Sequence, residues 1–375
     1  MNDKKINLAF ITTLLDTGGA ERHWEELICA IDHTRFNIIL ICLYHLGPIG
    51  EKIKASGVPT YSGILSNKFS VFGVIKLIRI LKDNNISLAF LIKQPVTIAY
   101  TILATRFTAC RNIVVAFHGT SAPKNKIGTF LFNRVCALFV TRFVAIGTKH
   151  KIHLINSDYI PANKITIIFN GTNIGRFGRE IDRAAKKRSL GIPVCNKVVA
   201  IVARLHAIKR HEIFLKMAQI VSKEFNEVTF LVVGEGKEKN NITAMIDSLG
   251  IGEKVKLLGL RTDIEELNKI IDVSVLSSGK ITETLPMTLI EAMASAVPVV
   301  STDVGSISDL ILNGQNGFLV PHESPEKLAH AVLRVLKDDD LASKMGIKGK
   351  DLATARFSTE AMAKNYEDLF TSLHG

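Results

Sequence analysis

Two glutamates, Glu283 and Glu291, lie eight positions apart in the stretch TETLPMTLIEA (282–292), with Pro286 between them. Proline is favoured at the first position of a helix and disfavours helix in the residue before it. We therefore expect Glu283 in an approach loop and Glu291 more than one turn into the helix that follows. A helix N-terminus attracts anions, and the two carboxylates can accept hydrogen bonds from hydroxyl groups. The stretch predicts a ligand that carries both an anion and hydroxyl groups.

A second stretch, VARLHAIKRHE (202–212), holds Arg204 and Lys209 five positions apart. We expect Arg204 to leave a strand and Lys209 to start a helix, so that both can face the mouth of one cleft. Two fixed cations suit a departing diphosphate, because its negative charge grows as the bond to it breaks. Taken alone, this spacing is also common on protein surfaces.

The stretch TLLDTGGAERH (13–23) follows the first expected strand, and its Gly18 and Gly19 can expose backbone N–H groups to a negative group. It is neither a G-x-G-x-x-G dinucleotide fingerprint nor a Walker loop, which lowers the support for NAD and ATP sites. Each of three further candidates at strand ends has an ordinary structural interpretation, a buried histidine or a tight turn, beside a functional one. These candidates are His118, Asn170 and Gly234.

Charge is distributed unevenly along the 375 residues. Residues 1–175 hold 20 Lys and Arg against 9 Asp and Glu, whereas residues 176–375 hold 27 against 26. A basic first half predicts an anionic partner such as nucleic acid, phospholipid or a phosphorylated substrate. The absence of a zinc finger or an RNA-recognition signature disfavours nucleic acid. The segment FSVFGVIKLIRILK (69–82) fits either a core helix with snorkelling basic side chains or a patch that binds an anionic membrane surface.

The composition, 47% hydrophobic and 22% charged, is that of a globular protein. The five cysteines form no C-x-x-C pair and the first residues lack a signal-peptide pattern, so we expect a cytoplasmic protein. The sequence has no H-E-x-x-H motif and no Cys/His cluster, so we expect no built-in metal site. No apolar run reaches the roughly 18 residues that a membrane span needs.

Short runs rich in Val, Ile and Leu alternate with helix-like segments along the chain, as is typical of parallel strands covered on both faces. We predict strands at 6–14, 37–43, 86–92, 112–117, 143–146, 165–169, 198–203, 228–234, 255–259, 273–277, 297–302 and 317–320. We predict helices at 20–31, 70–83, 96–106, 127–140, 148–156, 209–224, 237–249, 286–295, 324–337 and 340–355. The pattern predicts two successive doubly wound α/β domains, joined near 171–191, with ligands bound beyond the carboxyl ends of the strands in the cleft between them.

Taken together and in this order, the motifs resemble those of the family-4 retaining glycosyltransferases of the GT-B fold (glycosyltransferase group 1). The run ETLPMTLIEAMASAVPVVSTDVGSISDLILNGQNGFLV (283–320) is similar to that family's most diagnostic segment, an E-x7-E motif followed by EAMA-x-G-x-PVV-x-T-x-x-GG. The early GGAE, the Arg-x4-Lys pair, the NG and the GEG turn also follow the family order. The resemblance implies two facing Rossmann-like domains, 1–172 and 173–357, and a C-terminal helix, 358–375, that crosses back to the first domain.

The resemblance implies catalytic roles for four of the residues above. Arg204 and Lys209 would neutralise the diphosphate, and Glu283 would hold hydroxyls of the donor sugar. His118 would lie beside the sugar and help to stabilise the charged transition state.

The resemblance also implies a set of donor contacts. Gly18 and Gly19 would lie against the donor phosphate and sugar, and Glu291 would hold the ribose hydroxyls. The other implied donor-binding residues are Asn170, Gly234, Thr284 and Leu285.

This chain departs from the family pattern at several positions. Thr284 and Leu285 replace a commoner Gly-Phe, so the loop must accommodate a Cβ near the donor. Arg210 stands where a glycine is usual, and Ala296 replaces the glycine before the PVV run.

By resemblance, the protein is a hexosyltransferase that moves a sugar from a nucleotide-diphosphate sugar to a glycan or lipid-linked acceptor, with retention at the anomeric carbon, in cell-surface polysaccharide or glycolipid synthesis. It would need no cofactor and no metal, and its basic first half would hold the acceptor and touch the inner membrane leaflet. A nucleotide-sugar 2-epimerase and a catalytically silent nucleotide-sugar-binding subunit are the alternatives. The sequence leaves open the sugar, the nucleotide, the acceptor, the linkage and the oligomeric state.

Overall fold

A computed structural model describes residues 5–16, 19–67, 70–120, 126–279 and 283–374. The chain divides into two compact units. Unit 1 comprises Met1–Gly171 and Thr359–Gly375, and unit 2 comprises Thr172–Ser358.

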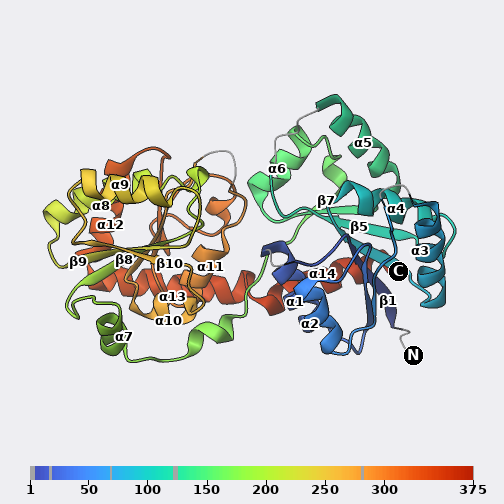
Figure 1. The fold of residues 1–375 in the computed structure, drawn as a ribbon, viewed down its shortest axis with the longest axis horizontal. Helices are drawn as coiled ribbons and strands as arrows, with labels where there is room; N and C mark the ends of the chain where they lie inside the picture. Colours follow the sequence, from blue (N-terminus) through green and yellow to red (C-terminus); the bar gives the residue numbers. More distant parts are fainter. Residues whose placement is uncertain (1–4, 17–18, 68–69, 121–125, 280–282, 375) are drawn as a thin grey trace. The chain divides into compact units, whose positions relative to one another are not determined.

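Unit 1 is built on a sheet of parallel strands in the order β3-β2-β1-β4-β5-β6-β7, of which β1, β5 and β7 are labelled in Figure 1. Its strands are β1 (Ile6–Thr12), β2 (Phe36–Cys42), β3 (Thr60–Tyr61), β4 (Leu88–Ile92), β5 (Asn112–Ala116), β6 (Arg142–Ala145) and β7 (Ile165–Ile167). Its helices are α1 (Gly19–Ala30), α2 (Gly47–Ala55), α3 (Val71–Asp83), α4 (Pro95–Thr105), α5 (Lys126–Phe139), α6 (Thr148–Asn156) and α14 (Thr359–His374). Leu8 and Phe10 of β1 belong to one core cluster, whereas Ala9 and Ile11 belong to another. Helices therefore cover both faces of the sheet, as the continuous apolar runs predict.

Each face of this sheet has its own helix layer. The buried residues of α1, α2 and α14 pack on one face, and those of α3, α4, α5 and α6 pack on the other. Helix α14, which comes from the end of the chain, places Tyr366 and Phe370 against Phe90 of β4, with ring centroids 5.1 and 5.5 Å apart. The last helix is thus part of the core of unit 1.

Unit 2 contains a second parallel sheet, in the order β10-β9-β8-β11-β12-β13. Its strands are β8 (Lys197–Val202), β9 (Val228–Val233), β10 (Val255–Gly259), β11 (Val273–Leu276), β12 (Val299–Thr302) and β13 (Gly317–Val320). Its helices are α7 (Arg183–Ser189), α8 (His211–Glu224), α9 (Lys239–Ser248), α10 (Ile264–Ile270), α11 (Met287–Ala294), α12 (Pro325–Leu336) and α13 (Asp339–Arg356). In both sheets the strand order reverses beside the first strand, as in doubly wound folds.

The sequence-based prediction places the long elements within a few residues but misses the short ones α2, α7, α10 and β3. Helix α2 begins with Gly47 and Pro48, which are typical turn residues, yet it forms and buries Ile49 and Ile53. The stretch 171–191, expected as the join, instead contains α7 and belongs to unit 2 from Thr172 onwards. None of the described helices combines the length and the apolar character that crossing a bilayer requires.

Helix α11 ends in a Schellman motif. The Ala296 N–H donates to the Met293 carbonyl at 2.9 Å, and the Val297 N–H donates to the Ala292 carbonyl at 3.0 Å. Ala296 has a φ of 58°, in the left-handed region that favours glycine. This explains why the family pattern has glycine at this position.

Replacing Ala296 with glycine should stabilise the protein by about 1 kcal/mol, because a left-handed conformation is strained for alanine and its exposed methyl group contributes little packing. Urea unfolding measures the change. Ala342→Gly, inside helix α13, is the matched control and should destabilise by about 1 kcal/mol. A destabilising Ala296→Gly would contradict the assigned backbone strain.

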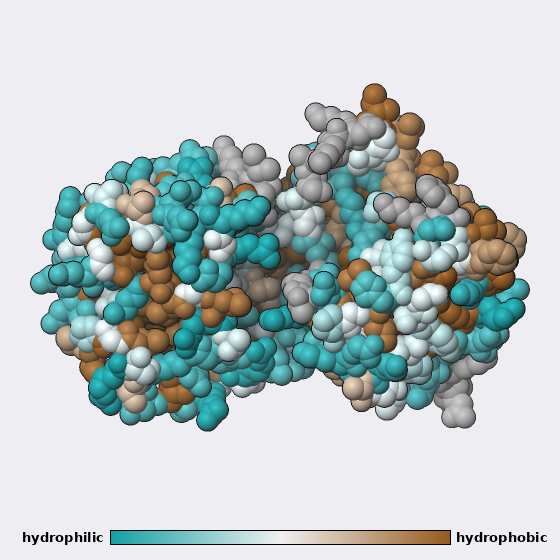
Figure 2. Space-filling view, viewed as in Figure 1, coloured by the Kyte–Doolittle hydropathy of each residue, from teal (hydrophilic) through white to brown (hydrophobic). Residues whose placement is uncertain are grey.

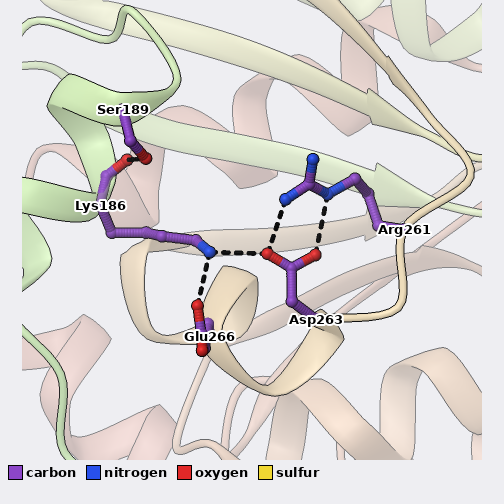
Figure 3. Close-up of polar contacts among 5 residues, drawn as sticks. All are labelled: Lys186, Ser189, Arg261, Asp263 and Glu266. Atoms are coloured by element: carbon purple, nitrogen blue, oxygen red, sulfur yellow. Dashed lines mark hydrogen bonds and ion pairs between the residues drawn. The ribbon is translucent and has the colours of Figure 1, made fainter.

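A cluster of charged side chains ties α7 to the loop before α10 (Figure 3). The Lys186 Nζ donates to Asp263 and to Glu266, at 2.6 Å in each case. Arg261 donates to both oxygens of Asp263, at 2.8 and 2.6 Å. Hydrogen bonds from Arg261, and then those from Lys186, hold the pKa of Asp263 well below its usual value although burial opposes this.

Replacing Asp263 with asparagine should lower the free energy of unfolding at pH 7 by about 1–2 kcal/mol. Because folding lowers the pKa of Asp263, its stabilising effect is complete above the unfolded pKa of about 4 and is lost as the pH falls towards the folded value. The difference in the free energy of unfolding between wild type and Asp263→Asn should therefore become smaller as the pH is lowered from 7 to 3, and urea unfolding at each pH measures it. Asp247→Asn, at an exposed position on α9, is the control and should have the same free energy of unfolding as wild type at each pH.

Candidate active site

The residues that could do chemistry in unit 2 lie at the carboxyl end of its sheet. The strand order reverses at the neighbouring central strands β8 and β11. Ligands of doubly wound sheets bind beyond the strands at this point. Arg204 and Lys209 follow β8, and Glu283 follows β11, so the sheet brings two distant stretches of sequence to one place.

Lys209 and Glu283 form a direct ion pair, in which the Lys209 Nζ donates to the Glu283 Oε2 at 2.6 Å. The Ser278 hydroxyl donates to the same oxygen at 2.7 Å. Glu283 and Ser278 are buried, with 9% and 0% of their surface exposed, and the Lys209 side chain is 20% exposed. The carboxylate is thus held between a cation and a hydroxyl group, and the cation remains accessible to a ligand.

The loop that carries Lys209 is fastened to the end of β11. The Ser277 hydroxyl donates to the carbonyl oxygens of Lys209 at 3.0 Å and Arg210 at 2.9 Å, and the Gly279 N–H donates to the Ile208 carbonyl at 2.9 Å. Arg210 has a φ of 51°, which explains the glycine of the family pattern. Its guanidinium is bound by Glu212 and by Glu323. Lys209 ends a 3₁₀ turn (Ala207–Lys209), and helix α8 begins only at His211, two residues later than predicted.

Three backbone contacts at glycines shape the site. A Cβ on Gly234 would lie 2.1 Å from the Ala203 carbonyl oxygen, and a Cβ on Gly236 would lie 2.1 Å from the Leu205 carbonyl oxygen. The GEG turn therefore packs backbone to backbone against the loop of Arg204. The third contact is at the loop of Glu283, where a Cβ on Gly305 would lie only 1.7 Å from the Glu283 carbonyl oxygen.

The segment after Glu283 has the expected arrangement. Glu283 lies in a loop, Pro286 directly precedes α11, and Glu291 lies more than one turn into that helix and is half-buried. Thr284 and Leu285 are buried, and the Thr284 carbonyl accepts from the Ser306 N–H at 2.9 Å. The structure thus places Thr284 and Leu285 just before α11 and Glu291 in its second turn, close in sequence to the ion pair.

Arg204 differs from Lys209 in its surroundings. Its side chain is exposed and forms no ion pair with a described residue. It lies two residues after β8, beside the backbone contact between Ala203 and Gly234. An unpaired guanidinium on a packed loop can bind an anionic group without first breaking an internal salt bridge.

The sequence candidates of unit 1 lie with two further histidines. His118, just after β5, stacks on His23 of α1 with ring centroids 6.3 Å apart and planes 11° apart. Asn170 is buried and lies beside His118. His150 accepts from the Ile146 N–H through its Nδ1, at 3.2 Å. Gly19 is the first residue of α1, whereas Gly18 lies outside the described residues.

These histidines are neutral at physiological pH. Burial, then the neighbouring His23 and His150, lowers the pKa of His118 to about 3, although Asn170 opposes the shift. Burial lowers the pKa of His23 to about 4 against a hydrogen bond with the Gly171 backbone. Burial likewise lowers the pKa of His150 to about 4. His118 can therefore exchange hydrogen bonds with a sugar, but it carries no fixed positive charge in this state.

Several residues of these sites have no distinctive sequence signal. Ser277 and Ser278 could be suspected only as polar residues at the end of an apolar strand, and Gly305 as a glycine after another. His23 belongs to the GGAERH stretch, but no motif spacing in the sequence marks it as a site residue. Among the described residues, no three His, Cys, Asp or Glu side chains are grouped so as to hold a metal ion.

Two family models match the chain. The model of "Glycosyl transferases group 1" matches residues 182–352, and that of "Glycosyltransferase Family 4" matches residues 17–176. The chain belongs to the group 1 and family 4 glycosyltransferases. The family resemblance seen in the sequence is thereby confirmed, as is the expectation of an enzyme that acts as a transferase.

This glycosyltransferase has curated relatives. It is 23% identical to the UDP-Gal:alpha-D-GlcNAc-diphosphoundecaprenol alpha-1,3-galactosyltransferase of Escherichia coli, over 98% of this chain and 97% of the relative. It is 26% identical to the N-acetyl-alpha-D-glucosaminyl L-malate synthase of Bacillus anthracis, over 69% of this chain and 67% of the relative.

Solved structures show the same fold. Anabaena HepE in complex with UDP aligns with a TM-score of 0.84 and 20% identity, over 98% of this chain and 100% of that chain. A glycosyltransferase from Rickettsia africae aligns with a TM-score of 0.83 and 20% identity, over 98% of each chain. The glycosyltransferase therefore has the predicted GT-B fold, with two parallel α/β units.

Proposed function

We propose that this glycosyltransferase moves a hexose-type sugar from a nucleotide-diphosphate sugar to a glycan or lipid-linked acceptor, with retention at the anomeric carbon, in the synthesis of a cell-surface polysaccharide or glycolipid. The observation that carries this proposal is the Lys209–Glu283 pair at the reversal of strand order in unit 2. It joins a cation suited to a phosphate with a carboxylate suited to sugar hydroxyls.

In the proposed reaction, the bond between the anomeric carbon and the diphosphate oxygen breaks, and the electron pair stays with the diphosphate. The acceptor oxygen forms a new bond to the same face of the anomeric carbon, and its proton passes to the leaving phosphate oxygen. Arg204 and Lys209 stabilise the negative charge that grows on the diphosphate. Glu283 positions the sugar, and the neutral His118 lies beside it.

The remaining proposed donor contacts fit the same ligand. Glu291 would bind the ribose hydroxyls, and Asn170, Gly234, Thr284 and Leu285 would contact the donor. Gly18 and Gly19 are proposed at the phosphate and sugar. The names of the E. coli galactosyltransferase and of the HepE complex both mention a uridine nucleotide, so UDP-sugars are the first donors to test.

We propose that no metal ion is needed, because Arg204 and Lys209 supply the positive charge that a divalent cation would otherwise bring. We also propose that the protein works in the cytoplasm at the inner face of the membrane. The excess of basic residues in the first half supports contact with anionic lipid or with a lipid-linked acceptor.

The test is an assay of nucleotide diphosphate release from a panel of UDP-, GDP- and ADP-sugars, with and without lipid-linked acceptors. We expect release that depends on the acceptor, persists in EDTA and yields a product with the anomeric configuration of the donor by NMR. Inversion would overturn retention, and loss of activity in EDTA would overturn metal independence. Interconversion of donor sugars without nucleotide release would identify a 2-epimerase instead.

A further inference from the structure

Exposed apolar side chains are concentrated on one helix layer of unit 1. Of the fifteen large hydrophobic residues that are exposed in the described part of the chain, eleven lie between residues 71 and 152, and none lies on α1, α2 or α14. Single exposed apolar residues are normal on a protein surface, but contiguous ones mark an interaction site.

Helix α5 turns an apolar side away from the protein. Ile127, Leu131, Val135 and Leu138 recur every three or four residues along one side of this helix, and they are 54–76% exposed. The opposite side faces the sheet, with Cys136 and Ala137 in the core. An ordinary surface helix has the reverse arrangement, with its apolar side inward.

The apolar side of α5 continues over the two neighbouring helices. Helix α4 contacts both α3 and α5. Figure 2 shows the hydrophobic surface running along this edge of unit 1, from α5 towards α3. We define the α3–α5 surface as the exposed residues Val71, Phe72, Ile75, Leu103, Phe107, Ile127, Phe130, Leu131, Val135 and Leu138.

The same layer is strongly basic. Residues 71–156, which span α3 to α6, contain twelve Lys and Arg and a single acid, Asp83. Helices α1, α2 and α14 on the other face of the sheet hold seven acids and four bases. Exposed cations stand among the apolar residues: Lys76 and Arg79 on α3, Arg106 just after α4, and Arg134 on α5. Apolar area and positive charge thus coincide on one side of unit 1.

We propose that the α3–α5 surface docks on an anionic lipid bilayer. The apolar side chains of α5 and of the first turn of α3 enter the boundary between headgroups and acyl chains, while the exposed lysine and arginines contact lipid phosphates. A second copy of this chain is a poorer occupant, because two such basic faces repel each other. A small soluble anion would not explain the apolar side of α5. The inference deepens the membrane contact proposed above, and it rests on the proposed function for the lipid-linked acceptor that makes membrane docking useful.

The experiment measures co-sedimentation of the full chain with phosphatidylcholine vesicles that contain or lack phosphatidylglycerol, at low and high NaCl. We expect binding that needs phosphatidylglycerol and weakens with salt. The triple variant Leu131→Gln/Val135→Gln/Leu138→Gln should lower the partition coefficient about 30-fold or more, because three apolar side chains no longer leave water. Lys76→Glu/Arg79→Glu should lower it about tenfold or more, on anionic vesicles only.

The matched control is Leu260→Gln/Ile347→Gln, which removes two exposed apolar side chains of unit 2 and should leave vesicle binding unchanged. All the replaced residues are exposed, so thermal melting should show that each variant is folded. Equal binding by the triple variant and wild type, or no binding to anionic vesicles, would overturn the proposal. A wild-type dimer that the triple variant converts to a monomer, without vesicle binding, would identify an interface between copies and would also overturn it.

The assay of nucleotide release separates this inference from the proposed function. A chain that releases nucleotide diphosphate but does not bind vesicles keeps the proposed sugar transfer and refutes both the docking surface and the proposed place at the membrane. A chain that binds vesicles through α5 but uses no nucleotide sugar keeps the surface and refutes the proposed function.

Discussion

Replacing Lys209 with alanine should lower the turnover of nucleotide sugar by about 10²–10³-fold, by analogy with the loss of one fixed donor at a developing anion. The Lys209 Nζ pairs with the Glu283 carboxylate at 2.6 Å. Its loss therefore removes a charge from the proposed diphosphate site and also leaves a buried carboxylate without its counter-ion. Measurements of kcat at saturating donor, together with thermal melting, record both effects.

A double variant separates catalysis from stability in this experiment. Lys209→Ala/Glu283→Gln removes the buried charge together with its partner, so it should recover part of the stability lost in Lys209→Ala but none of the turnover. Lys216→Ala, which removes an exposed lysine from α8, is the control and should match wild type in both measurements. Undiminished turnover in folded Lys209→Ala would refute the role proposed for this residue.

Replacing Gly305 with alanine should destabilise the protein by about 3–4 kcal/mol and lower turnover about 10²-fold or more. The new Cβ would lie 1.7 Å from the Glu283 carbonyl oxygen, so the loop that carries the carboxylate must move. The φ of 54° at this position adds strain for any residue with a side chain. A displacement of about 1 Å is enough to damage a site that works by positioning.

Gly314 provides the matched control for Gly305. It has a φ of 79°, but a Cβ there would meet nothing within 4 Å. Gly314→Ala should therefore cost only the backbone strain, about 1–2 kcal/mol, and leave turnover unchanged. Equal behaviour of the two alanine variants, in urea unfolding and in the kinetic assay, would show that the contact with Glu283 has no importance for the site.

The fold can be predicted because strands that are buried on both faces are short, continuous apolar runs, which are easily recognised in the sequence. Helix α2 was missed because its Gly47 and Pro48 are typical of turns, and only the burial of Ile49 and Ile53 in the tertiary structure makes the helix stable. The helices α7 and α10 are too short, at about two turns each, to show a clear helical periodicity of apolar residues.

The site was only partly predictable. Lys209 and Glu283 stand out through motifs, but their contact across 74 positions depends on β8 lying beside β11. Ser278 and Gly305 act through one hydrogen bond and one close backbone approach, and neither leaves a pattern in the chain. Arg210 and Ala296 depart from the family pattern, and their left-handed backbone, visible only in the structure, explains why glycine is usual there.

The amino-acid order alone determined the two α/β units, the family and the motifs that carry its chemistry, because periodicity and turn chemistry are local properties of the chain. Only the tertiary structure decided which groups meet. It paired Lys209 with Glu283, and it turned one apolar side of α5 towards solvent instead of the core. Periodicity shows which side chains can be buried together, but the packing of neighbouring elements decides which side is buried and what it contacts.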